Sequence, residues 1–168
     1  MSVSEDRAHF TMWCMMAAPL ILGNDITNMT PEVLSIITNK DVIAIDQDPL
    51  GVQGLRLKKD GDLQYWFKPL ENGDWAFCIL NGGEEDKTVA VDWSELEVND
   101  ELSGRSTGFA TVNYNVKDLW NADAKPFTTL VKGKGKLKKQ MVSNVEDITV
   151  ASHDVATFRL SPVPEKKK

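Results

Sequence analysis

The triplet Ser152-His153-Asp154 contains the three side-chain types of a nucleophilic hydrolase triad. In such a triad the serine attacks, the histidine takes its proton and the aspartate orients the histidine, and the three side chains converge from separate elements. Three adjacent residues do not converge in this way, so we predict a turn before the last strand and no triad. The other histidine, His9, lies in a predicted helix, where we interpret it as a packed or capping residue.

Carboxylates are the remaining candidates for chemistry in the first fifty residues. Predicted helix starts account for the acids at positions 5, 6, 32 and 41, and a boundary turn accounts for those at 46 and 48. Only Asp25, with Asn24, follows a predicted parallel-type strand, and α/β barrels place their active sites at that end of their strands. Asn24 and Asp25 are therefore candidate substrate-binding residues. The alternative is that both are loop formers that bond their own backbone.

No spacing in the sequence indicates a metal or a cofactor. The chain has no phosphate-binding glycine loop and no metal-type arrangement of His and Cys, so we expect neither group. Cys14 and Cys78 lie in apolar runs far apart in the sequence, which favours two buried free thiols over a disulfide.

The elements that would position Asn24 and Asp25 are those of an α/β domain. Residues 2–18 predict a helix that begins with a Ser2/Glu5 capping box and is apolar on nearly every side, as buried helices are. Pro19 ends it, and the uniformly apolar run Leu20–Leu22 predicts a short parallel-type strand. Thr30-Pro31-Glu32 predicts the start of a second helix, and residues 41–45 a further short one.

The pattern changes after a Pro- and Gly-containing boundary at residues 46–51. Asp60-Gly61 and Asn72-Gly73 predict hairpins. About eight short strands at this spacing indicate an antiparallel sandwich, and we expect them at residues 53–57, 63–67, 75–81, 87–93, 114–119, 128–131, 147–150 and 155–160. We interpret the basic stretch 132–139 as a solvated hairpin edge whose lysines keep it from aggregating. The last four residues are interpreted as a frayed tail.

One strand and two helices cannot close a parallel domain, since a (β/α)8 barrel takes about 250 residues. We therefore predict a mostly β chain, in which residues 1–50 are the incomplete C-terminal end of a (β/α)8 barrel (helix, strand, helix). Residues 51–168 would form the antiparallel β-sandwich domain.

Composition excludes some partners. The net charge of −6 and the pI of about 4.9 argue against a nucleic-acid partner. No run of apolar residues is long enough to span a membrane, so we expect no membrane partner. The acidic, polar N-terminus has no signal-peptide pattern; if a longer parent is secreted or periplasmic, its signal would lie upstream.

Residues 8–54 carry a close resemblance to a known family. The stretch HFTMWCMMAAPLILGNDITNMTPEVLSIITNKDVIAIDQDPLGVQG resembles the late part of alpha-galactosidases (melibiases) of glycoside hydrolase family 27. The rest resembles the family's C-terminal β-domain more loosely, most clearly at LQYWFKP, WAFCILN, VKDLW and DVATFRL. One departure is Asp46, where many relatives have Asn, and we interpret it as variation.

The resemblance implies a barrel followed by a sandwich, in an enzyme that cleaves terminal α-linked galactose with retention. Such a mechanism uses two carboxyl groups about 5–5.5 Å apart. In the family both aspartates lie upstream of anything that matches this chain, so no catalytic residue can be carried over. The parent enzyme would act on galactosides, and this chain alone would be inactive.

Two other hypotheses stay open at this point. The chain could be a stand-alone carbohydrate-binding module that presents Trp66, Trp75, Trp93 or Trp120 to a sugar, although core packing also explains these residues. Alternatively, the sandwich could have a structural role and support the barrel beside the first helix. In that case an isolated chain would either self-associate through the apolar residues 8–22 or fold them onto the sandwich.

Overall fold

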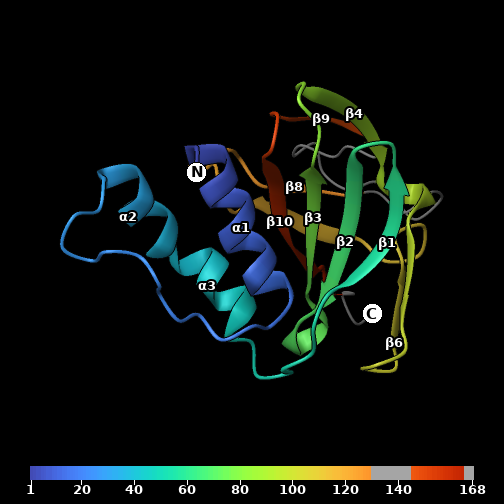
Figure 1. The fold of residues 1–168 in the computed structure, drawn as a ribbon. Coiled ribbons are helices and arrows are strands. Elements are labelled where there is room, and N and C mark those ends of the chain that lie inside the picture. The colour runs from blue at the N-terminus through green and yellow to red at the C-terminus, as the bar shows by residue number, and fades with distance from the viewer. Residues whose placement is uncertain (130–144, 165–168) are drawn as a thin grey trace.

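Three helices precede an antiparallel β-structure in the computed structural model, which describes residues 1–129 and 145–164 (Figure 1). The helices are α1 (Val3–Met15), α2 (Pro31–Ile37) and α3 (Lys40–Asp46). The strands are β1 (Leu55–Asp60), β2 (Leu63–Pro69), β3 (Trp75–Asn81), β4 (Lys87–Asp92), β5 (Glu97–Asp100), β6 (Arg105–Gly108), β7 (Tyr114–Asp118), β8 (Phe127–Thr128), β9 (Val145–Val150) and β10 (Val155–Pro162).

One six-stranded sheet forms the centre of the fold, in the order β1-β2-β3-β10-β7-β8. The pairs β4-β9 and β5-β6 complete the sandwich, and every pairing between the described strands is antiparallel. The predicted mostly β fold class is confirmed. Strands β5 and β6 were not predicted. The basic stretch 132–139, part of the predicted strand 128–131 and the C-terminal tail lie outside the described residues.

Local sequence signals explain the helix starts and the first hairpins. Ser2 and Glu5 form the predicted capping box, because Ser2 Oγ accepts from Glu5 N at 3.2 Å and Glu5 Oε2 accepts from Ser2 N at 2.6 Å. Thr30 caps α2, with Pro31 at its first position. Gly61 and Gly73 adopt φ values of +56° and +84° at the two predicted hairpins, a conformation that glycine allows at little cost.

The predicted strand at Leu20–Leu22 does not form. This segment is irregular, and no described strand pairs with it. A strand's backbone amides and carbonyls need a neighbouring strand, and the sheets of this chain lie on the other side of α1 (Figure 1). Helix α1 also ends at Met15 instead of residue 18, with Ala17 in the left-handed region at φ 51°.

Strand β3 of the central sheet is buried on both faces over most of its length, and its side chains alternate between two apolar clusters. Trp75, Phe77 and Ile79 of β3 point into the sandwich core, whereas Ala76 and Cys78 point toward the helices. The sandwich core is rich in stacked and edge-on rings, contributed by Tyr65, Phe67, Trp75, Phe77, Trp93, Phe109, Tyr114 and Phe158. The second cluster, here called the helix-side cluster, contains Ala8, Cys14, Met15, Val42, Ile45, Leu70, Ala76, Cys78, Leu119 and Val155.

Candidate functional site

The helix-side cluster is framed by polar contacts between α1 and the sandwich. At one end, the Arg7 side chain of α1 donates two hydrogen bonds to Asp154, in the turn before β10. Its Nε donates to Asp154 Oδ1 at 2.8 Å, and its Nη2 donates to Oδ2. The Asp154 side chain is 4% exposed and that of Arg7 31% exposed. The hydrogen bond to Asp154 raises the pKa of Arg7. This pair fixes the N-terminal half of α1 to the turn that precedes β10.

Lys68 of β2 holds the other end of α1. Its side chain is fully buried, and its Nζ donates to the carbonyl oxygen of Cys14 at 2.8 Å, in the last turn of the helix. A cation at this end of a helix complements the negative pole of its dipole. Burial lowers the pKa of Lys68, while the nearby charge of Asp46 acts in the opposite direction. Lys68 therefore acts as a buried C-terminal cap for α1.

Further hydrogen bonds join the helices to the sandwich between these ends. Trp120 Nε1 donates to Thr11 Oγ1 at 3.1 Å, and Asn39 Nδ2 donates to the carbonyl oxygen of Leu119 at 2.9 Å. The amide of Gly54 donates to the carbonyl oxygen of Met15 at 2.7 Å. One face of segment 8–22 is thus folded onto the sandwich, as one of the two alternatives predicted. Self-association through this segment stays a prediction.

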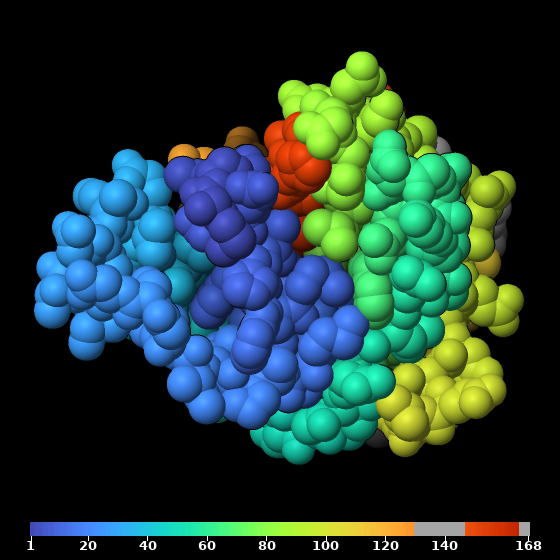
Figure 2. Space-filling view, in the orientation of Figure 1, coloured from blue at the N-terminus to red at the C-terminus, as the bar shows by residue number. Residues whose placement is uncertain are grey.

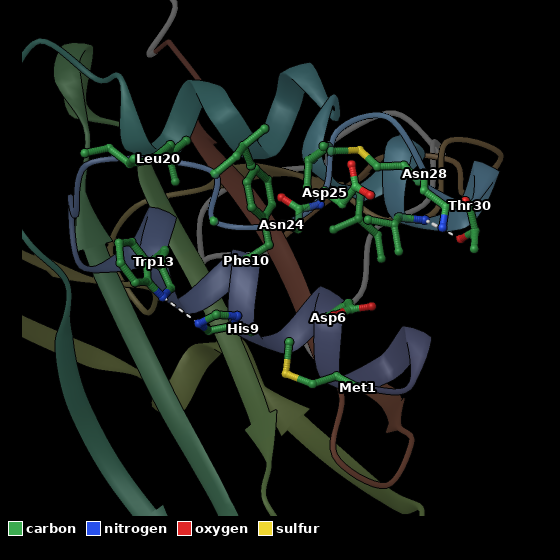
Figure 3. Close-up of a pocket in the computed structure, with 17 residues that line it drawn as sticks. Met1, Asp6, His9, Phe10, Trp13, Leu20, Asn24, Asp25, Asn28 and Thr30 are labelled. Carbon is green, nitrogen blue, oxygen red and sulfur yellow. Dashed lines mark hydrogen bonds between the residues drawn. The ribbon is translucent and has the colours of Figure 1, made fainter.

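The two candidate substrate-binding residues, Asn24 and Asp25, line a cavity of about 490 Å³ on the opposite side of α1 (Figure 3). This cavity lies between α1, the segment that follows it and α2. It is mainly apolar, with Phe10, Trp13, Leu20, Ile21, Leu22, Val33, Ile36 and Ile37 among its lining residues. Trp13 Nε1 donates to His9 Nε2 at 2.8 Å, and both side chains are exposed, so His9 is a surface residue and not a packed one.

Asp25 is engaged locally. Its Oδ1 accepts from the amide of Thr27 at 2.9 Å and from Thr27 Oγ1 at 2.6 Å. Both hydrogen bonds from Thr27 lower the pKa of Asp25, and the one from the Thr27 side chain has the larger effect. A carboxyl group that donates a proton in catalysis needs the opposite shift, so this environment does not make Asp25 a general acid. Whether Asn24 and Asp25 bind substrate is left as a proposal below.

The triplet Ser152-His153-Asp154 forms no triad, as predicted. Ser152 Oγ donates to the carbonyl oxygen of Gly83 at 2.9 Å, His153 Nε2 lies 3.3 Å from Glu84 Oε2, and Asp154 binds Arg7. The three side chains therefore serve separate structural contacts around the turn, where His153 adopts a φ of 54°.

Cys14 and Cys78 are buried free thiols, as predicted. Burial raises the pKa of each to about 12, so neither thiol forms the reactive thiolate near neutral pH. In residues 1–129 and 145–164, no group of three or more His, Cys, Asp or Glu side chains is placed to hold a metal ion. The search of the same residues finds no helix long and apolar enough to cross a membrane.

The four tryptophans proposed for a sugar-binding surface pack within or against the two apolar clusters. Trp75 and Trp93 are buried in the sandwich core, and Trp66 and Trp120 pack against the helix-side cluster. None of the four stands free on the surface as a sugar platform requires. The binding-module hypothesis gains no support from their positions.

Lys68 and Arg7 were not singled out from the sequence. Lys68 carried a usable signal, because it is the one charged residue within the apolar strand LQYWFKP, and a lysine at such a position needs a partner. Arg7 carried none, since its partner Asp154 is 147 residues away in the sequence.

The described residues thus form a helical segment, α1 to α3, packed on an antiparallel β-sandwich. The family profile described as "Alpha galactosidase C-terminal beta sandwich domain" matches residues 60–160, and that described as "Alpha galactosidase A" matches residues 1–48. The chain belongs to the alpha-galactosidase family.

Individual relatives agree with the profiles. The chain is 37% identical to alpha-galactosidase A of Cellvibrio japonicus over 162 residues, which cover 96% of this chain and 36% of that protein. The structure of alpha-galactosidase I from Mortierella vinacea is similar with a TM-score of 0.71 at 27% identity, over 95% of this chain and 36% of that one. The Saccharomyces cerevisiae alpha-galactosidase solved with raffinose has a TM-score of 0.74 at 24% identity, over 97% and 44% respectively, and supports the fold alone.

The chain thus spans little more than a third of the length of the Cellvibrio relative.

Proposed function

We propose that this chain is the C-terminal part of a retaining alpha-galactosidase, whose complete form hydrolyses terminal α-linked galactose from galactosides. The main support is that two family profiles match consecutive parts of the chain, residues 1–48 and residues 60–160. The Cellvibrio relative also aligns over nearly the whole chain. In this proposal residues 1–50 end the barrel and residues 51–168 form the sandwich that supports it.

We further propose that the chain alone does not hydrolyse galactosides. A retaining glycosidase needs one carboxylate as nucleophile and a second carboxyl group as acid and base, about 5–5.5 Å apart. Of the described carboxylates, only Asp6 and Asp25 line the 490 Å³ cavity, and the pKa of Asp25 is shifted away from that of a proton donor. The reacting aspartates would therefore come from the upstream part of the enzyme.

In the complete enzyme, Asn24 and Asp25 are proposed to contribute to the sugar site from the segment that follows α1. Asn24 offers an amide donor and acceptor, and Asp25 offers carboxylate oxygens, which suit sugar hydroxyls. Both side chains are exposed here, and only Thr27 among the described residues bonds to the Asp25 carboxylate. Their position at one cavity supports the proposal.

Incubation of the purified chain with a chromogenic α-galactoside tests its inactivity. We expect turnover no greater than that of a buffer control, and turnover abolished by Asp25→Asn would overturn the proposal that the reacting groups lie upstream. The coding sequence before Met1 tests the identity of the parent. We expect an in-frame continuation with further strand–helix units and two aspartates at strand ends, and an unrelated domain there would contradict it.

A further inference from the structure

The sequence contains two Asn-Gly pairs, Asn72-Gly73 and Asn81-Gly82. An asparagine before glycine is chemically labile, because glycine has no Cβ to shield its backbone nitrogen from the side-chain amide of the preceding residue. Attack by that nitrogen converts the asparagine to an acid, a reaction called deamidation. Its rate in a folded protein depends on how firmly the structure holds the attacking nitrogen and the side-chain amide.

Asn72 is held weakly. It lies in the short turn Glu71–Gly73 between β2 and β3, and its exposed side chain forms no hydrogen bond with another residue of the described ranges. Its φ of 60° places it in the left-handed region, which a residue with a side chain adopts less readily than glycine. Attack requires the backbone of Asn72 to leave this conformation, and its left-handed φ favours that departure.

Asn81 is held firmly, since its side chain is fully buried. The amide of Gly82, which would have to attack, donates to the carbonyl oxygen of Asp62 at 3.0 Å. The Nδ2 of Asn81, which would have to leave, donates to the carbonyl oxygens of Glu85 at 2.8 Å, Val150 at 3.1 Å and Ala151 at 3.0 Å. Both nitrogens are therefore engaged, and the reaction would first have to break buried hydrogen bonds.

We propose that Asn72 is a site of spontaneous deamidation in the folded chain, whereas the fold protects Asn81. The Gly73 nitrogen bonds to Cγ of Asn72 as the bond from Cγ to Nδ2 breaks, and ammonia leaves with the proton that Gly73 loses. Water then opens the cyclic imide at either of its carbonyls. The product is an aspartyl or an isoaspartyl residue at position 72, and each carries a negative charge at neutral pH.

The turn that would be modified is a contact between the sandwich and the segment that follows α3. Asp48 of that segment is buried, and its Oδ1 accepts from the amide of Glu71 at 2.9 Å. Figure 2 shows the segment after α3 (teal) at the lower surface of the molecule, below α1.

Deamidation should loosen this contact for two reasons. A carboxylate at position 72 adds a negative charge close to Glu71 and Asp74. The isoaspartyl product also lengthens the backbone by one carbon, which disturbs the hydrogen bond from the amide of Leu70 to the carbonyl oxygen of Asp74, now 2.9 Å long.

Ageing of the purified chain at mildly alkaline pH tests the proposal, with one sample folded and a second unfolded in urea. Peptide mapping by mass spectrometry measures deamidation at positions 72 and 81 separately. In the folded chain we expect Asn72 to react at least about tenfold faster than Asn81, because only Asn81 must first break buried hydrogen bonds. In urea the two rates should agree within about threefold, since the fold no longer distinguishes the two Asn-Gly pairs.

Asn72→Gly is the matched control. Glycine adopts the positive φ of this position and has no side-chain amide, so the variant should keep the turn and form no acidic product there. Circular dichroism checks that the variant is folded. Hydrogen exchange gives a second readout: amides 70–74 should lose protection in the aged wild-type chain but not in the aged variant.

The folded sample decides the outcome. If Asn72 stays intact in the folded chain, whether or not it reacts in urea, the proposal is overturned. Equal rates at positions 72 and 81 in the folded chain would also overturn it, because the fold would then not protect Asn81. If isoelectric focusing shows the same amount of acidic product in the aged wild type and in aged Asn72→Gly, the reaction lies elsewhere and the proposal fails.

Discussion

Replacement of Asp154 by asparagine should loosen the attachment of α1 to the sandwich. Asn keeps the size of the side chain but removes the charge that Arg7 binds through two hydrogen bonds. Breaking a buried ion pair by removing one partner costs about 3–5 kcal/mol. Because the Arg7 side chain is 31% exposed, water can partly solvate it in the variant. We therefore expect Asp154→Asn to lower the free energy of unfolding by about 2–3 kcal/mol.

Urea unfolding followed by tryptophan fluorescence measures this loss by linear extrapolation. The matched control is Asp41→Asn, which breaks a second ion pair between helices and sandwich, Lys117–Asp41 at 2.8 Å. Both of its side chains are about half exposed, so this change should cost less than about 0.5 kcal/mol. Equal losses in the two variants would refute the assignment of Arg7–Asp154 as the buried attachment of α1.

Three other perturbations follow from local geometry. The capping box lowers the pKa of Glu5 below 4.5, so the ionised Glu5 side chain stabilises the fold above that pH. The free energy of unfolding of wild type should exceed that of Glu5→Ala at neutral pH, and this difference should disappear as pH falls through the lowered pKa. A constant difference from pH 7 to 3 in urea titrations would contradict this. Gly54→Ala should cost about 1–3 kcal/mol, since its Cβ would lie 3.0 Å from a backbone oxygen, whereas Gly23→Ala meets nothing within 4 Å and should be near neutral by thermal unfolding. Cys14 and Cys78 should react with a thiol reagent at pH 8 only after unfolding, and fast labelling of native protein would disprove their burial.

The sequence predicted those parts of the fold that short-range chemistry controls. The capping box at Ser2 and the N-cap at Thr30 placed two helix starts, and Gly61 and Gly73 marked the first two hairpins. The strands of the central sheet were predicted within a few residues at most ends. Strands β5 and β6 were missed because their four-residue segments are mostly polar and give no clear alternation.

The candidate site was only partly predictable. Asn24 and Asp25 were named from their place after an apolar run, and the structure puts both at one cavity. Their role in sugar binding stays a prediction. The partners of Arg7 and Lys68 could not be read from the sequence, because each contact joins segments more than 50 residues apart.

By itself, the sequence determined the family, the mostly β class and the apolar character of residues 8–22, since these depend on residue type and spacing along the chain. The tertiary structure decided which of those apolar groups are covered. Cys14 and Met15 are buried against the sandwich, whereas Ile21 and Leu22 stay exposed. It also decided that Leu20–Leu22 is not a strand here. A strand exists only through hydrogen bonds to a neighbour, and no neighbouring strand for it is present among the described residues.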